Sequence, residues 1–179
     1  MEQRWTTPVA QKDIRKAHVG DVVFLSGTVV TVRDAAHQKL LSLTTKSLPF
    51  TFSEAALYHC GPLVKKTGNA WTVLSAGPTT SSRMNTVEPE IIKRYGVRVI
   101  IGKGGMDTRT GQALKKHQGV YLAFPGGAGV VAADAVEHVD NVYWLDELGM
   151  TEAIWVFTVK DFGPLVVAMD SYGKTLYKK

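Results

Sequence analysis

Cysteine is almost absent from this chain of 179 residues, which contains only Cys60. One thiol cannot form an internal disulfide, and by itself it cannot hold an iron–sulfur cluster or a structural zinc ion, which need about four protein ligands. Long apolar runs are absent too: no stretch approaches the roughly 18 apolar residues of a membrane span, and residues 1–10 contain no apolar signal core. These absences predict a reduced, cytoplasmic protein without a membrane segment, in which any metal chemistry comes from elsewhere.

The motifs of the common hydrolase and metal-dependent classes are also missing. The sequence has no HExxH, CxxC or GxSxG pattern, and its five histidines are dispersed: His18, His37, His59, His117 and His138. His59 and Cys60 are neighbours on a predicted strand, so their side chains should point to opposite faces of a sheet. We therefore predict no metal site and no nucleophilic triad within this chain.

Positive charge is in excess but is not concentrated. Lysine and arginine together number 21 against 16 aspartates and glutamates, which gives a formal net charge of +5. The sequence lacks the alternation of aromatic and basic side chains that is typical of RNA-binding surfaces, and it lacks a recognition-helix pattern. We predict no nucleic-acid binding and give more weight to small anions, because three cations occupy special backbone positions.

Hydrophobic residues make up 45% of the chain, enough for a sizeable core, and we expect a single domain over residues 1–179. Apolar, β-branched runs predict strands over Val22–Val32 with a bulge at Ser26–Gly27, Ala56–Cys60, Trp71–Ala76, Val97–Ile101, Val120–Phe124 and Val142–Leu145, then a pair, Ala153–Val159 and Leu165–Ala168, that turns at Asp161–Pro164. A turn-rich stretch, Lys65–Asn69, joins the second and third strands. Helices are predicted over Asp34–Leu43, Pro89–Tyr95 closed by Gly96, Thr110–His117 and Gly127–Glu137. This alternation indicates an α/β domain with parallel strand pairs and more β structure than a plain doubly wound sheet.

Arg33 ends the first long strand, Asp34 begins the helix that follows, and His37 lies one turn into that helix. A strand that leads into a helix N-terminus presents free backbone N–H groups, and a guanidinium is a bidentate donor suited to a carboxylate. This pattern favours anion binding. The alternative, in which Asp34 simply caps the helix and pairs with Arg33 while His37 packs against the sheet, fits the residues equally well.

Lys103 occupies a similar position after the buried strand Val97–Ile101, within Gly102–Gly105. The flanking glycines let a ligand approach the backbone closely and leave the lysine ammonium as a compact point charge. A glycine turn with an exposed lysine is the alternative.

The segment GPTTSSRM, residues 77–84, follows another strand and combines four hydroxyls with Arg83. Thr79 and Arg83 are four residues apart, so on a helical turn they would share one face. Helix capping would account for one hydroxyl and would require neither the others nor the arginine. Together with Arg33 and Lys103, this segment indicates a receptor for a small dianion.

A glycine-rich segment offers a competing interpretation. Residues 127–132, GAGVVA, match the dinucleotide pattern GxGxxA after a strand, and Asp146 and Glu147 follow at about the spacing of 20 residues that such a site uses. The segment lies late in a short chain, Pro125 interrupts the turn, and glycine-rich turns are also common where elements pack closely. A dinucleotide-binding module is therefore the alternative from a different class of function.

Six segments carry a resemblance to a known family: GDVVFLSGTVVTVRDAAH (20–37), YHCGPLVKK (58–66), SAGPTTSSRMN (75–85), IGKGGM (101–106), FPGGAG (124–129) and DFGPLVVAMDSYG (161–173). In this order they resemble the β subunit of two-subunit class I fumarate hydratase and of L-tartrate dehydratase, and equally the C-terminal domain of single-chain iron–sulfur fumarases. The likeness runs from about Thr6 to Tyr177. Several motifs in register make it more specific than any one of them.

The resemblance implies a swivelling β/β/α domain with a mixed central sheet, which closes over an α subunit that carries a 4Fe-4S cluster. In that family the cluster has three cysteine ligands, all in the other subunit or domain, and its open iron acts as a Lewis acid on the substrate. This arrangement would explain the lone cysteine here. A heterotetramer of two such heterodimers is the expected assembly.

The resemblance also implies roles for the cations and for His37. Carried over by motif, Arg33, Arg83 and Lys103 correspond to the family's ligands for the substrate carboxylates. His37 matches the histidine of the RDxxH motif, a candidate acid/base or orienting group.

The hydroxyls of residues 79–82 are the remaining family positions. Thr79 matches the threonine proposed as the base that takes a proton from carbon, and Thr80, with the neighbouring Ser81 and Ser82, would bind substrate. A free hydroxyl is a very poor base at neutral pH, so Thr79 would need a strong local positive field to stabilise an alkoxide-like state.

The implied reaction is the reversible hydration of fumarate to L-malate, with a small dicarboxylate as substrate and this chain as the β subunit. Within the family the alternative is L-tartrate dehydratase, which converts tartrate to oxaloacetate, because the same cationic loops serve either diacid.

Overall fold

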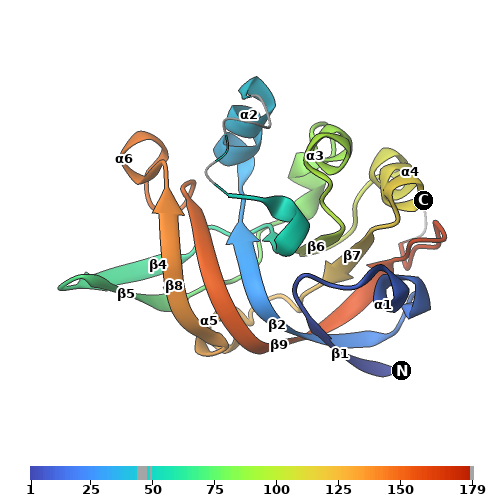
Figure 1. Ribbon diagram of the computed structural model, residues 1–179, viewed down its shortest axis with the longest axis horizontal. Coiled ribbons are helices and arrows are strands. Elements are labelled where there is room, and N and C mark those ends of the chain that lie inside the picture. The colour runs from blue at the N-terminus through green and yellow to red at the C-terminus, as the bar shows by residue number, and fades with distance from the viewer. Residues whose placement is uncertain (44–47, 49, 178–179) are drawn as a thin grey trace.

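The computed structural model describes residues 1–43, 48 and 50–177 and is shown in Figure 1. Its longest early strand, β2 (Val22–Thr31), forms from the β-branched run that the sequence predicts. β2 pairs in parallel with β1 (Glu2–Thr6) along its first half and with β3 (Ala56–Tyr58) along its last residues. It also pairs antiparallel with β9 (Ile154–Met169) along most of its length.

The sheet has the strand order β1-β2-β3-β6-β7-β9-β8, and the added β2–β9 pairing closes five of these strands into a ring. The ring consists of β2, β3, β6 (Val99–Gly102), β7 (Val120–Ala123) and β9, and β8 (Val136–Tyr143) lies outside it at the edge of the sheet. β2, β3, β6 and β7 are parallel neighbours, whereas β9 runs antiparallel to β2, β7 and β8. The predicted mixed α/β fold is therefore confirmed, with a layering consistent with a β/β/α domain.

Three helices, α2 (Asp34–Ser42), α3 (Glu88–Tyr95) and α4 (Thr108–His117), lie side by side on one face of the sheet (Figure 1). Between these helices and the sheet lies a buried apolar cluster that includes Leu40, Ile91, Ile100 and Leu114. Gly96 ends α3 in the left-handed conformation, with φ of 66°, so the predicted closure by glycine is confirmed.

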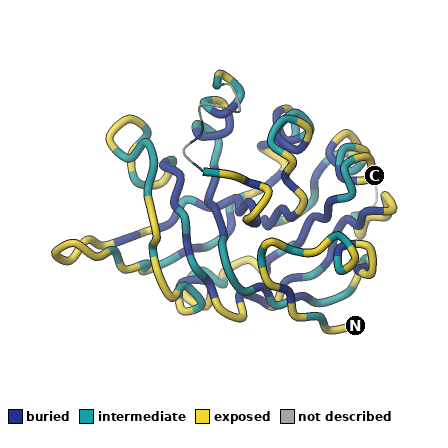
Figure 2. Tube along the Cα trace, viewed as in Figure 1, coloured by how far each residue is buried: buried dark blue, intermediate teal, exposed yellow. Residues whose placement is uncertain are grey.

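A second apolar cluster fills the other side of the sheet around Trp155, Phe157 and Phe162. It is covered by the hairpin of β4 (Leu63–Thr67) and β5 (Ala70–Ser75), and by the short helices α1 (Gln11–Lys16) and α5 (Gly129–Asp134). A further short helix, α6 (Leu145–Leu148), precedes β9. Figure 2 shows the buried strands at the centre and the exposed tip of the hairpin. None of the helices in the described ranges is long and apolar enough to cross a membrane.

The end of the chain differs from the prediction. The expected strand pair with a turn at Asp161–Pro164 is wrong, because β9 is one strand of 16 residues. β2 provides an antiparallel partner along most of β9. The residues expected to form the turn remain in the strand, where the pairing with β2 shifts register on either side of Leu25 and Asp161 has a φ of 48°. The same region of β2 contains the predicted bulge, which is confirmed by the register shift between Leu25 and Gly27.

Three further boundaries were mispredicted. The helix predicted over Gly127–Glu137 is only the six residues of α5, and the strand predicted over Val142–Leu145 begins earlier, as β8. β8 is an edge strand with many exposed polar residues, so its sequence lacks an apolar run. Most of the stretch read as a turn, Lys65–Asn69, belongs to β4, because a two-residue turn suffices between β4 and β5. β1 and α1 were not predicted at all.

Candidate functional site

The loops that carry the predicted site residues follow strands of the parallel part of the sheet. β2 leads to Arg33, β3 leads to His59, and β6 ends beside Lys103. Because the carboxyl ends of parallel strands meet at one edge of a sheet, segments far apart in sequence come together there. Backbone hydrogen bonds join these ends: Val32 N to Tyr58 O (2.8 Å), His59 N to Ile101 O (2.8 Å) and Phe124 N to Gly102 O (2.7 Å).

The segment of residues 77–84 lies across the same edge. The backbone N–H of Thr79 donates to His59 O (2.8 Å), the N–H of Ser81 donates to Lys103 O (3.0 Å), and Thr80 forms a parallel bridge with Lys103. A 3₁₀ helix, η3 (Ser81–Met84), follows. Thr79 therefore precedes the helical turn on which it was predicted to share a face with Arg83. The two side chains are nevertheless close, since Arg83 Nη1 lies 3.4 Å from Thr79 Oγ1.

Two of the three predicted cations converge on one carboxylate. Arg83 binds Asp34 with both arms of its guanidinium, through Nε to Oδ1 (3.0 Å) and through Nη2 to Oδ2. Arg33 Nε lies 3.6 Å from Asp34 Oδ2 and 3.2 Å from Glu152 Oε1. Burial opposes the charged form of Asp34, but the hydrogen bond from Arg83 and the charges of both arginines outweigh it and lower the pKa of this carboxyl.

The sequence suggested that Asp34 caps α2, and the structure shows that it does not. Arg33 occupies the cap position without a side-chain cap, and Asp34 is the first helical residue, where its charge is favourable to the helix dipole. Its principal partner is Arg83, which comes from a distant segment, and not its neighbour Arg33.

Arg33 and Lys103 each pass over a glycine. A Cβ added to Gly61 would lie 2.6 Å from Arg33 Cδ and 2.5 Å from Thr151 O, so only glycine leaves room for this arginine. A Cβ on Gly126 would lie 3.6 Å from Lys103 Cδ. The side chain of Arg33 is 24% exposed and that of Arg83 is 46% exposed. Both can therefore reach an anion from solvent.

The eight predicted site residues thus fall into two groups. Those that reach the surface are Arg33, Thr79, Thr80, Ser82, Arg83 and Lys103. His37 and Ser81 are fully buried beneath them. Neither buried side chain touches solvent, so any contact with a ligand in this conformation belongs to the first group.

The buried pair belongs to a polar network that the sequence did not reveal. Glu88, at the start of α3, accepts hydrogen bonds at Oε2 from His37 Nε2 (3.0 Å) and from His59 Nε2 (2.9 Å). His59 Nδ1 lies 2.8 Å from Ser81 Oγ, and all four side chains have no exposed surface. The only sequence signal was a glutamate directly before Pro89 at a helix start, which is also common in ordinary helices.

The charge in this network is fixed by its geometry. His37 Nδ1 lies 2.8 Å from Arg33 O, which can only accept, so the proton is on Nδ1. Burial disfavours the charged form of His37, but the Glu88 carboxylate outweighs it and raises the pKa of His37. Burial likewise opposes the ionised form of Glu88, yet the two histidines lower its pKa to about 2. His37 is thus an imidazolium paired with a carboxylate.

His59 differs from His37 in its charge. Burial lowers the pKa of His59, against the attraction of Glu88. A neutral ring with its proton on Nε2 donates to Glu88 and leaves Nδ1 to accept from the Ser81 hydroxyl.

Cys60 points away from this network, as predicted. His59 faces the helices, whereas Cys60 lies in the apolar cluster on the other side of the sheet. It is fully buried, and burial raises the pKa of its thiol. A thiolate ligand to an iron–sulfur cluster does not fit this environment.

His37, His59 and Glu88 are the one group of potential metal ligands in the described ranges whose ligand atoms all lie within 4.8 Å of one another. Their facing atoms are 2.9 to 3.0 Å apart, and each of these contacts is already a hydrogen bond. These three side chains are therefore already engaged with one another and do not fit an iron–sulfur cluster.

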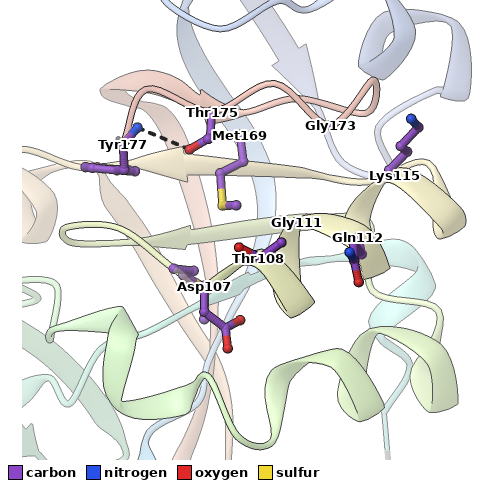
Figure 3. A pocket seen from close by; sticks show the side chains of 10 residues that line it. Asp107, Thr108, Gly111, Gln112, Lys115, Met169, Gly173, Thr175 and Tyr177 are labelled. Carbon is purple, nitrogen blue, oxygen red and sulfur yellow. Dashed lines mark hydrogen bonds between the residues drawn. The ribbon is translucent and has the colours of Figure 1, made fainter. Parts of the chain in front are cut away.

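One well-defined cavity lies elsewhere. It has a volume of about 620 Å³ and lies between α4 and the C-terminal turn, where Met106, Met169 and Tyr177 supply apolar walls and Lys115 a charge (Figure 3). None of the predicted site residues lines it. The candidate site is instead an open surface of loops.

Known proteins resemble this chain over almost its whole length. The family model described as "Fumarase C-terminus" matches residues 3–179. The chain is 47% identical over 173 residues to "Putative L(+)-tartrate dehydratase subunit beta" of Methanocaldococcus jannaschii, covering 96% of this chain and 89% of that protein. It is 43% identical over 176 residues to "L(+)-tartrate dehydratase subunit beta" of Escherichia coli K12, covering 98% and 87%. It is 44% identical over 172 residues to "Putative fumarate hydratase class I" of Geobacillus stearothermophilus, covering 96% of this chain but 32% of that protein.

The burial of Cys60 leads to a simple prediction. The native protein should not react with a water-soluble disulfide reagent. The protein unfolded in urea should react through its single cysteine and release one equivalent of the reagent's thiol leaving group. Ser82→Cys, at an exposed position, is the control and should add one fast-reacting thiol to the native protein. A native Cys60 that reacts as fast as that control would contradict the buried position of this thiol.

Proposed function

Because this chain belongs to the Fumarase C-terminus family, we propose that it forms half of a site that adds water to, or removes it from, a four-carbon diacid. The chain is a β subunit of the hydro-lyase family that includes L(+)-tartrate dehydratase and class I fumarate hydratase. The finer assignments are part of the proposal: the residue roles draw on the geometry described above, and the candidate substrates draw on the named relatives.

The convergence of Arg33 and Arg83 on one carboxylate is the observation that carries the proposal. Two guanidiniums that already hold Asp34 offer the planar, charge-assisted donors that recognise a carboxylate. Arg33 Nε is buried against Glu152 and Asp34, so a ligand would be met by the partly exposed remainder of this side chain. Lys103, held by its backbone against Thr80 and Ser81, supplies a third positive charge for the second carboxylate of a diacid.

These cations also suit the chemistry of water elimination. Removal of a proton from the carbon next to a carboxylate builds a second negative charge on that carboxylate. Fixed positive groups that face this charge can supply several kcal/mol of stabilisation to the transition state. The side chains of Arg33, Arg83 and Lys103 would bind the diacid and stabilise its most charged form.

Thr79 is the proposed proton acceptor. Its hydroxyl is half-buried and lies 3.4 Å from Arg83 Nη1, and its backbone is fixed by His59 O. The neighbouring guanidinium would favour an alkoxide-like state of this weak base. Thr80 and Ser82 are exposed beside it and would donate hydrogen bonds to the substrate.

The rest of the site is proposed to come from an α subunit. The relatives named as β subunits imply such a partner, and the 4Fe-4S cluster expected for the family would be bound there, where it would act as the Lewis acid on the substrate hydroxyl. β5 and α5 adjoin residues 77–84, and the exposed apolar side chains Leu74, Val130 and Val131 lie on them. Exposed apolar surface of this kind often marks an interface. A heterotetramer stays the proposed assembly.

Two substrates have specific support. Fumarate and L-malate are supported by the motif set and by the relative named as a class I fumarate hydratase, and L-tartrate is supported by the relatives named as tartrate dehydratase β subunits. The three cations discriminate little between these diacids, which differ by one hydroxyl. The choice between them would then lie with groups of the partner subunit.

Turnover by the assembled complex tests the function directly. The chain is co-expressed with its matching α subunit and reconstituted without oxygen with iron and sulfide. Fumarate formation from L-malate is followed by ultraviolet absorbance, and oxaloacetate formation from L-tartrate by a coupled reduction. We expect one of the two diacids to be dehydrated efficiently. A complex that contains the cluster and converts neither diacid nor a related hydroxy acid would overturn the proposed function.

The role of Thr79 is tested by Thr79→Val in the same complex. If Thr79 accepts the proton, kcat should fall by about 10²- to 10⁴-fold, the usual contribution of a positioned base, with a small change in KM. Thr86→Val makes the same chemical change at an exposed position outside the site and should leave both constants unchanged. If Thr79→Val instead keeps its kcat and only raises KM, Thr79 is a ligand and the base lies elsewhere.

A further inference from the structure

Glu88 is the centre of a chain of hydrogen bonds that leads to every cationic loop of the site. On one side, His37 connects Glu88 to the carbonyl of Arg33: Nε2 lies 3.0 Å from Glu88 Oε2, and Nδ1 lies 2.8 Å from Arg33 O. On the other side, His59 connects Glu88 to Ser81: Nε2 lies 2.9 Å from Glu88 Oε2, and Nδ1 lies 2.8 Å from Ser81 Oγ. The loops that hold Arg33 and Ser81 are thus tied to one buried carboxylate.

The chain continues from Ser81 to Lys103. The backbone N–H of Lys103 donates to Ser81 Oγ (3.1 Å), and a Cβ added to the neighbouring Gly102 would overlap the same oxygen. The Tyr121 hydroxyl lies 3.0 Å from Ser81 Oγ and donates to Gly104 O (2.8 Å), so it holds the next residues of this loop. Lys103 therefore depends on the Ser81 hydroxyl for its backbone position.

His59 adds a direct bond to the proposed base. Its carbonyl accepts from the backbone N–H of Thr79 (2.8 Å) while its ring binds Glu88. A shift of the ring would therefore move the segment of residues 77–84 as well. Since the ring is an edge neighbour of His37, with centroids 5.4 Å apart, both histidines share the same small volume.

This network is an unusual way to fill a protein interior. A buried charge pair is often no more stabilising than apolar side chains of the same size, because both ions lose their hydration. Glu88 Oε1 is buried without a hydrogen-bond partner among the described residues, which costs further free energy. Buried polar networks do, however, fix the relative positions of their members more narrowly than apolar contacts. The placement favours a role in geometry over a role in stability.

We propose that Glu88, acting through His37 and His59, is the positioning residue that keeps Arg33, Thr79 and Lys103 in register for a diacid. The inference rests on the proposed function for the identity of the ligand, and on the hydrogen bonds alone for the coupling of the loops. Glu88 touches no ligand in this arrangement, so its effect is transmitted through the two imidazoles.

Glu88→Gln tests the coupling, because it keeps the size of the side chain and removes its charge. Hydrogen exchange of backbone amides is measured on the full chain, independent of any activity. We expect the amides of Thr79 and Lys103 to exchange faster by about tenfold or more, as for the loss of one hydrogen bond, while amides of the β2–β9 ladder keep their rates. Glu90→Gln, on the exposed side of the same helix, is the matched control and should change neither set.

The assembled complex provides the second measurement. Glu88→Gln should lower kcat by about 10- to 100-fold per folded complex, because displacements near 1 Å in a reacting pair have effects of this size, and it should leave KM within a few-fold. Unchanged amide exchange together with an unchanged kcat would overturn the proposal, and so would a loss of stability with full kcat in the folded fraction. A wild-type complex without diacid turnover would defeat the proposed function alone, because amide exchange still decides the coupling.

Ser81→Ala covers the case in which Glu88→Gln does not fold. It removes the hydroxyl that joins His59 to Lys103 and leaves the buried charge pair intact. We expect faster exchange at Lys103 and a lower kcat, with no change at amides of the β2–β9 ladder. Wild-type exchange at Lys103 in this variant would overturn the proposal.

Discussion

The carboxylate of Glu88 lies where α2, the end of β3 and the start of α3 meet, and these elements come from well-separated parts of the chain. It is held there by two imidazoles, and each imidazole uses its second nitrogen to reach a loop at the edge of the sheet. At the surface, Arg33 and Arg83 share Asp34, and the loops that carry the side chains of the site are tied to the buried network through His37 and Ser81. Their arrangement therefore depends on this buried interaction beneath them.

Two features position the site residues: the parallel strands and the buried network of Glu88. The strands of the parallel part bring Arg33, His59 and Lys103 to one edge of the sheet, which fixes their positions only approximately because each residue lies in a loop beyond its strand. The network and the contact of Thr79 N with His59 O then set them more closely. A site made this way is open on its outer side, which suits the proposal that this chain shares its substrate with a partner subunit.

Local patterns in the sequence were enough to predict much of the fold. β2 with its bulge, α3 with its closing Gly96 and the strands that lead to the cations follow from residues that act over one or two turns. β9 was mispredicted because its irregular centre at Asp161 is held by a partner strand more than 130 positions away. β8 was mispredicted because an edge strand needs no apolar run.

The cations of the candidate site could be singled out from local sequence patterns for the same reason. Arg33 and Lys103 follow strand ends, and Arg83 closes a run of four hydroxyl residues, so their positions in the sequence carry a signal. Glu88 and His59 carry none, since their roles arise only when α2, α3 and β3 pack together. The pairing of Asp34 with Arg83 carried no sequence signal either, because Arg83 lies 49 residues away and reaches it only through the tertiary fold.

The charge state of the two buried histidines tests the central claim, that an ionised Glu88 shared between two unlike imidazoles holds the site together. Nitrogen-15 chemical shifts of the imidazole rings, measured by NMR at neutral pH, report which ring nitrogens carry protons. The structure predicts that His37 is protonated on both nitrogens and that His59 is protonated on Nε2 alone. A neutral His37, or two rings in the same protonation state, would contradict it.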